Sequence, residues 1–165
     1  MNRALIDTDF LSYYFKGDLT VVDNFKKYLK EFDIIEISLI TYYEIMSGLL
    51  YKNAIKQLEI FNEFVSENIV IALTEETCKI SSEIYSKLRI NGELIDDVDI
   101  LIAGIAIEND MTLVTNNENH FGRIQGLKIE NWKIHYPSWW LPNTPYWYKS
   151  TLVEPNKSNI FFKCA

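Results

Sequence analysis

The sequence predicts an α/β fold, in which a mostly parallel sheet is covered by helices on both faces. Short apolar runs alternate along the chain with longer segments whose apolar residues recur every three or four positions. Strands that alternate with helices form βαβ units, and these units assemble into parallel sheets. Binding and catalytic groups of such sheets lie beyond the carboxyl ends of the strands, so we expect the functional residues of this chain to follow its strands.

The amino-terminal part of the chain predicts two strands with a helix between them. The first strand, 4–6, is an apolar run that ends at Asp7. The helix covers 21–32, because its apolar residues recur at helical spacing after a Gly-Asp pair. A second short apolar run predicts a strand at 34–38.

The middle of the chain predicts three helices and one strand. Residues 41–65 have a helical pattern that divides into two helices near residue 52. A strand follows at 69–73. The next helix, 75–90, ends before Gly92, since glycine readily adopts the left-handed conformation that closes many helices.

The last predicted helix, 98–108, is apolar on nearly every side, so we expect it to be buried at the centre of the fold. Strands at 111–115 and 127–134 complete the expected sheet.

Length and charge indicate one domain followed by an extension of different composition. The 165 residues carry a net charge of −7, which argues against a surface broadly devoted to phosphate backbones. Residues 1–131 hold 12 basic and 22 acidic side chains, whereas 132–165 hold four lysines, one acid, all four tryptophans and all four prolines. We therefore expect a domain over 1–134 and an aromatic, proline-rich extension over 135–165. The extension could fold back, bind a partner or stack on bases.

Several features favour the cytoplasm as the location of the protein. Two cysteines cannot form a disulfide framework. The longest uncharged apolar run, 100–107, is far shorter than the ~20 residues of a membrane-spanning helix. The first residues lack the layout of a signal peptide.

Two polar clusters follow the first two predicted strands. Asp7-Thr8-Asp9 follows 4–6 directly, and Thr41 and Glu44 come shortly after 34–38. Each cluster has a purely structural explanation, because Asp7-Thr8-Asp9 suits a helix N-cap and Thr41 with Glu44 matches a capping box. Their position at strand ends keeps a functional explanation open.

A third cluster, Asp96, Asp97 and Asp99, opens the predicted central helix, where acidic groups suit the helix dipole. Asp96 and Asp97 are expected in solvent. Asp99 shares a face with apolar residues three, four and seven positions later, so burial should oblige it to find a cation or strong hydrogen-bond donors.

The fourth cluster, Thr115-Asn116-Asn117, closes the strand at 111–115, where a plain turn is the alternative. If all four clusters meet, they form a pocket of oxygen ligands without Cys or His. Oxygen-only sites select Mg²⁺ or Mn²⁺, and one or two such ions activate water and stabilise a phosphoryl transition state.

In these motifs the chain resembles the PIN-domain ribonucleases, and specifically the VapC-type toxins of bacterial and archaeal toxin–antitoxin pairs. The resemblance extends over about 1–134, in the order and spacing of the family. The matching residues are Leu5, Ile6, Asp7, Thr8, Asp9, Ser38, Thr41, Glu44, Ile45, Gly48, Gly92, Asp99, Ile102, Ala103, Leu113, Thr115, Asn117, Phe121, Ile124, Gly126, Leu127 and Trp132.

The resemblance implies a PIN-like α/β/α sandwich and an endoribonuclease that requires Mg²⁺ or Mn²⁺. It assigns Asp7, Glu44 and Asp99 as the acidic metal ligands. Asn117, or less favourably Asn116, stands where many relatives have a fourth acid, so the number of metal ions stays open.

The resemblance also implies roles for three further residues. Thr115 would orient a water molecule or a ligand carboxylate. Asp9 and Thr41 would support the site without binding the ion.

The same resemblance implies an RNA substrate, a cognate antitoxin and a homodimer. Antitoxins of this family commonly wrap the toxin and insert a basic side chain into the acidic pocket. The aromatic run at 10–15 suits either interface or simple core packing. Cations that could hold RNA, or be ordinary surface charges, are Arg3, Lys16, Lys52, Arg89 and Arg123.

Two other functions remain open. Asp7 and Asp9 could be the nucleophile and acid of a haloacid-dehalogenase-type phosphatase, with Asp96 and Asp97 as its later acidic pair, but Glu44 would then have no purpose. A non-catalytic PIN-fold module could instead regulate through its partners.

Overall fold

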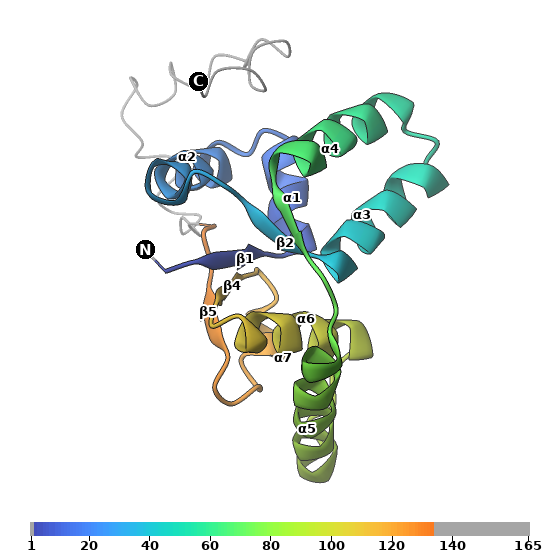
Figure 1. Ribbon diagram of the computed structural model, residues 1–165, viewed down its shortest axis with the longest axis vertical. Helices are drawn as coiled ribbons and strands as arrows, with labels where there is room; N and C mark the ends of the chain where they lie inside the picture. The colour runs from blue at the N-terminus through green and yellow to red at the C-terminus, as the bar shows by residue number, and fades with distance from the viewer. Residues whose placement is uncertain (1, 134–165) are drawn as a thin grey trace, which may run out of the picture.

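The computed structural model describes residues 2–133, in which five parallel strands form one sheet in the order β3-β2-β1-β4-β5 (Figure 1). The prediction of an α/β fold with a parallel sheet is confirmed. All five predicted strands occur, each within one or two residues of its expected start. They are β1 (Ala4–Ile6), β2 (Glu36–Ser38), β3 (Ile69–Ile71), β4 (Thr112–Val114) and β5 (Lys128–Glu130).

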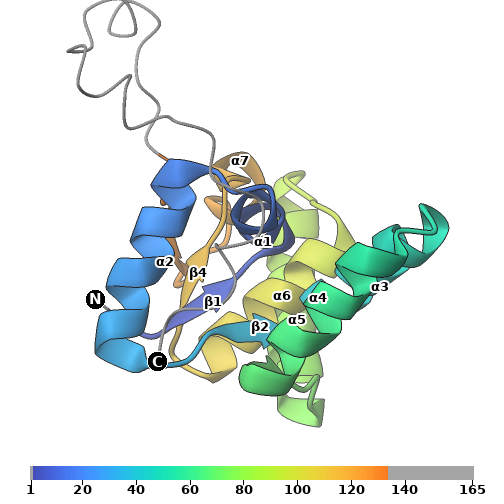
Figure 2. The same cartoon turned by 90° about the horizontal axis from the view of Figure 1, so that it is seen from above.

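Helices cover both faces of this sheet (Figures 1 and 2). One layer consists of α1 (Thr8–Phe15), α2 (Leu19–Phe32), α3 (Leu39–Tyr51) and α4 (Ile55–Glu67). The other consists of α5 (Glu75–Asn91), α6 (Asp97–Glu108) and α7 (Glu118–Phe121).

Alternation of side chains along β1 divides the core into two apolar clusters. Leu5 packs with the buried residues of α5, α6 and α7, whereas Ala4 and Ile6 pack with those of α1, α2 and α4. Because all three residues are buried, β1 has no polar face. Helix α6 is buried from Ile102 to Ala106, as its apolar sequence predicts.

The aromatic run at 10–15 is part of the core. Phe10 is fully buried, and Tyr13, Tyr14 and Phe15 pack partly buried against the same cluster. Trp132 closes this side of the domain, with ring centroids 5.5 Å from Phe25 and 6.5 Å from Phe10. Of the alternatives for this run, core packing therefore holds for Phe10.

Two helices lack a predicted range, although the N-cap explanation for Asp7-Thr8-Asp9 implies a helix start where α1 begins. Helix α1 carries a continuous aromatic run in place of a clear amphipathic spacing, and α7 spans a single turn, which is too short to show a period.

No helix within residues 2–133 is both long and apolar enough to cross a membrane. The predicted extension over 135–165, and the last residue of the strand expected at 127–134, lie outside the described residues.

Candidate active site

The site forms where the chain changes direction in the sheet. From β1 the chain moves outward to β2 and β3, and then returns to β4 on the other side of β1. The carboxyl ends of β1 and β4 are thus neighbours, and the backbone N–H of Asp7 donates to the carbonyl of Val114 at 3.0 Å. Such switch points are where α/β sheets bind their ligands.

Asp7 lies at this switch point and is almost fully buried, with 7% of its surface exposed. It is the N-cap of α1, because its Oδ1 accepts from the backbone N–H of Thr8 at 2.8 Å. Its Oδ2 accepts from the hydroxyl of Thr115 at 2.7 Å. The structural explanation for Asp7 as a helix cap is therefore confirmed, and the same carboxylate also contacts the end of β4.

Negative charge gathers around Asp7. The pKa of Asp7 is raised to about 7, chiefly by burial and in addition by the negative charges of Asp9 and Glu44, although the hydrogen bonds from Thr115 and Thr8 act in the opposite direction. Asp7 is thus close enough to Asp9 and to Glu44 for each of them to repel its charge. Such an arrangement is stabilised by a cation.

Asp9 lies beside Asp7 and has an unsatisfied oxygen. Its Oδ2 accepts from the backbone N–H of Asn116 at 2.8 Å, but its buried Oδ1 has no hydrogen-bond partner among the described residues. Burial raises the pKa of the Asp9 carboxyl, and the Asn116 N–H and the charge of Lys133 partly offset this rise. Oδ1 of Asp9 is therefore a further acceptor that a cation or a hydrogen-bond donor could satisfy.

Glu44 reaches the site from α3, and the capping box predicted for Thr41 and Glu44 is wrong. Helix α3 begins earlier, and its N-cap is Ser38, whose Oγ accepts from the backbone N–H of Thr41 at 2.8 Å. Thr41 is buried against Ser38, with hydroxyl oxygens 3.0 Å apart. Glu44 therefore does not cap the helix, and its carboxylate instead accepts a hydrogen bond from the hydroxyl of Thr8.

Asp99 enters from the first turn of α6, and Asp96 is the N-cap of that helix. Asp96 and Asp97 are exposed, as expected, whereas the Asp99 side chain is 20% exposed. Its Oδ2 accepts from the side-chain amide of Asn117 at 3.2 Å and lies 2.7 Å from Nδ1 of His120. Of the two expected kinds of partner, a cation or hydrogen-bond donors, the structure shows donors at Asp99.

Thr115 and Asn117 connect Asp7 to Asp99. The Thr115 hydroxyl donates to Asp7 and accepts from the backbone N–H of Asn117 at 3.0 Å, and the Asn117 side chain then donates to Asp99. The side chain of Asn116 is directed elsewhere, with its oxygen 3.4 Å from the amide of Asn131. Of the two amides, Asn117 therefore joins the acidic residues.

The donor set fits a hard divalent cation. Within residues 2–133, no group of three or more acidic, His or Cys side chains is already arranged to hold a metal ion. The chemistry of the side chains nevertheless suits one, because Asp7 and Glu44 repel each other and a buried oxygen of Asp9 has no donor. Carboxylate oxygens of this kind are ligands of Mg²⁺ and Mn²⁺.

A histidine that was not among the predicted site residues also borders the acidic groups, because His120 lies against Asp99. Sequence reasoning missed His120 because α7 had not been predicted. The signal was its position three residues after Asn117, which places the two side chains on one side of a helical turn.

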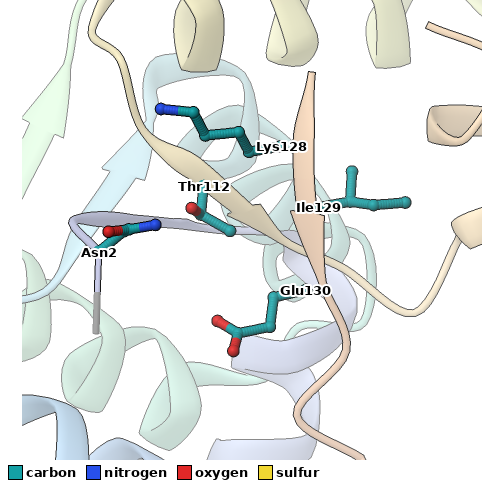
Figure 3. Close-up of a pocket in the computed structure, with 5 residues that line it drawn as sticks. All are labelled: Asn2, Thr112, Lys128, Ile129 and Glu130. Carbon is teal, nitrogen blue, oxygen red and sulfur yellow. The ribbon is translucent and has the colours of Figure 1, made fainter. Parts of the chain in front are cut away.

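Three of the proposed RNA-binding cations have partners, and one of them is Arg123, which donates to the carbonyl of Glu93 at 3.4 Å. Arg3 forms an ion pair with the buried Glu36, and the guanidinium of Arg89 lies over the ring of Tyr85. Figure 3 shows a hollow along β5 lined by Asn2, Thr112, Lys128, Ile129 and Glu130. None of the acidic site residues borders it, so this hollow is separate from the candidate site.

The PIN domain family profile matches residues 4–127. Among similar proteins, ribonuclease VapC1 of Methanocaldococcus jannaschii is 35% identical over 130 residues, which cover 78% of this chain and 87% of that protein. Ribonuclease VapC1 of Haemophilus influenzae is 26% identical over 132 residues, covering 78% and 96%.

Solved structures agree with these matches. The structure of VapBC2 from Rickettsia felis bound to a DNA fragment of its promoter aligns with a TM-score of 0.72 and 28% identity, covering 79% of this chain and 98% of that one. DNA-bound VapBC from Salmonella typhimurium gives a TM-score of 0.72 and 26% identity, covering 81% and 100%.

Proposed function

The chain belongs to the PIN domain family and is a relative of the VapC ribonucleases, and from this we propose that it is a metal-dependent endoribonuclease acting as the toxin of a type II toxin–antitoxin pair. One observation carries the proposal. Asp7 and Asp99 come from distant parts of the chain and are connected at the switch point of the sheet through Thr115 and Asn117.

We assign Asp7, Glu44 and Asp99 as the ligands of a Mg²⁺ or Mn²⁺ ion. Bound there, the ion would offset the repulsion among the carboxylates, activate water and stabilise charge on the phosphoryl group. Asn117, which is neutral, occupies the position expected for a fourth acid, so the region around Asp99 carries less negative charge than an aspartate would give it.

The remaining residues position these ligands. Thr115 holds Oδ2 of Asp7, and Thr8 holds the carboxylate of Glu44. Glu44 then helps to orient the water that attacks the phosphodiester. Asn117 holds Asp99, and Asp9 fixes the turn after β4 through the backbone N–H of Asn116.

The uncompensated acidic cluster also favours a basic protein partner. Several similar solved structures are VapBC antitoxin–toxin complexes. We propose that a cognate antitoxin places a basic side chain near Asp7 and Asp9, and that the chain forms a homodimer in the cytoplasm.

The phosphatase alternative finds less support. It requires Asp9 as a free acid beside Asp7, yet Oδ2 of Asp9 accepts a backbone hydrogen bond and its Oδ1 is buried. It also leaves the contact between Glu44 and Thr8 without a purpose. An aspartyl-phosphate trapped on Asp7 would favour this alternative over the nuclease.

Digestion of RNA during metal titration tests the proposed function. The purified full-length chain, separated from any copurified antitoxin and stripped with EDTA, should leave RNA intact, and added Mg²⁺ or Mn²⁺ should restore internal cleavage. Sequencing of the cleaved ends would identify the target. Failure to cleave any cellular RNA with either ion would instead indicate the non-catalytic module.

A further inference from the structure

We propose that His120 is a positioning residue for Asp99, which holds one carboxylate oxygen and leaves the other available to the cation. This inference rests on the proposed function, because it concerns the same metal site. It adds an imidazole nitrogen to a site in which the side-chain amide of Asn117 already donates to Asp99.

The contact between His120 and Asp99 is short and has a clear direction. Nδ1 of His120 lies 2.7 Å from Oδ2 of Asp99, which is the separation of a charge-assisted hydrogen bond. A carboxylate that binds a cation is ionised and has no proton to give, so in the metal-bound site the imidazole is the donor at Nδ1. The Asn117 amide donates to the same Oδ2 at 3.2 Å.

Both donors thus contact a single oxygen of Asp99. Oδ1 of Asp99 accepts no hydrogen bond from any described residue. Two donors on one oxygen restrict rotation of the carboxylate and keep Oδ1 free. Ligand carboxylates in metal sites are commonly oriented in this way by residues that do not touch the ion.

The turn that carries His120 is anchored on both sides. Its neighbour Phe121 is fully buried, and the backbone N–H groups of His120 and Phe121 both donate to the carbonyl of Asn117 at 3.2 Å. The His120 side chain itself is 42% exposed. The imidazole is therefore held at Asp99 by a fixed backbone rather than by burial, and its substitution should leave the core intact.

Three substitutions separate the two ring nitrogens. His120→Asn keeps a donor near the position of Nδ1, His120→Gln places a donor near the position of Nε2, and His120→Ala removes both. The dissociation constant for Mn²⁺ is measured by titration calorimetry on each full-length variant without RNA. Thermal unfolding in EDTA reports whether the fold is preserved.

The proposal predicts that His120→Ala and His120→Gln weaken Mn²⁺ binding by about 10-fold or more, with little change in the unfolding temperature in EDTA. His120→Asn should retain affinity close to that of the wild type. Equal Mn²⁺ affinity in wild type and His120→Ala would overturn the proposal. Retention by His120→Gln with loss in His120→Asn would also overturn it, because Nε2 would then be the important atom.

Failure of this proposal can be distinguished from failure of the proposed function. If the wild-type chain cleaves RNA with Mn²⁺ and His120→Ala binds Mn²⁺ equally well, only the role of His120 is wrong. If the wild type binds Mn²⁺ but cleaves no RNA, the proposed function is wrong, and the affinities of the variants still decide the role of His120.

Discussion

At the scale of single residues, Asp7 is the carboxylate of the site whose charged form is most strongly disfavoured by its surroundings. Its carboxylate is buried beside two others, so its charged form is disfavoured when no cation is present. The same residue caps α1 and contacts Thr115. The buried side chain of Asp7 therefore stabilises the start of α1. Its negative charge is unfavourable there unless a bound cation or a basic side chain compensates it.

The electrostatic cost of charging Asp7 predicts how stability depends on pH without metal. The folded-state pKa of Asp7 is raised to about 7 from its usual 3.8, so the folded protein binds this proton more tightly than the unfolded chain does. The resulting stabilisation is complete below about pH 4 and is lost as the pH rises through 7. In EDTA at pH 8, Asp7→Asn should be more stable than the wild type by roughly 2–4 kcal/mol, measured by urea unfolding.

At pH 4 this advantage of Asp7→Asn should disappear. Parallel pH profiles for wild type and Asp7→Asn would contradict the assignment of the raised pKa to Asp7.

The sequence allowed most site residues to be predicted, but not all of their contacts. Asp99 was expected to need donors, because its position on a buried helix is visible in the local apolar spacing. His120 was missed, because its approach to Asp99 depends on a one-turn helix and on the packing of Phe121. The spacing from Asn117 places His120 near that residue, but the contact with Asp99 on another helix depends on long-range packing.

At the scale of elements, the start of α3 decides what Glu44 can do. Ser38→Ala removes the hydroxyl that accepts from Thr41, and it should lower the free energy of unfolding by about 1 kcal/mol. Glu44→Gln should cost far less, since its remaining side-chain oxygen still accepts from Thr8. Chemical denaturation of both variants checks this. An unchanged free energy of unfolding in Ser38→Ala would contradict the assignment of Ser38 as the cap.

Helix α6, which carries Asp99, packs against α5 at Gly104. A Cβ atom at Gly104 would lie 2.1 Å from Oγ of Ser81 and 3.1 Å from the carbonyl of Thr77. Gly104→Ala should therefore destabilise the protein by about 1–3 kcal/mol, measured by urea unfolding.

Gly48 in α3 provides the matched control, because nothing lies within 4 Å of a Cβ atom there. Gly48→Ala should be neutral or stabilise by up to about 1 kcal/mol, since alanine favours helix. If Gly104→Ala is as harmless as Gly48→Ala, the two helices do not approach as closely as described.

At the scale of the whole molecule, the site depends on the strand order. Strand–helix alternation predicted a parallel sheet, but it did not reveal that β4 lies beside β1. That adjacency places Thr115 against Asp7, although the two residues are far apart in the chain. The adjacency of β1 and β4 arises because the chain returns across the sheet after β3, and no local sequence pattern indicates that return.

The core of the described domain is closed by Trp132, which is 5% exposed and packs on Phe10, Phe25 and Tyr28. A chain truncated after residue 134 should therefore unfold cooperatively at nearly the midpoint of the full chain. Circular dichroism during urea titration measures this. Loss of the cooperative transition would mean that 135–165 belong to the folding unit.

The central claim is that Asp99 and Asp7 form one metal-dependent catalytic site. The most direct test is RNA cleavage by purified full-length wild type and Asp99→Asn in Mg²⁺ or Mn²⁺, with matching thermal unfolding curves in EDTA as proof of an intact fold. We predict cleavage by the wild type that EDTA abolishes, and none by Asp99→Asn. Full cleavage by a correctly folded Asp99→Asn would contradict the claim.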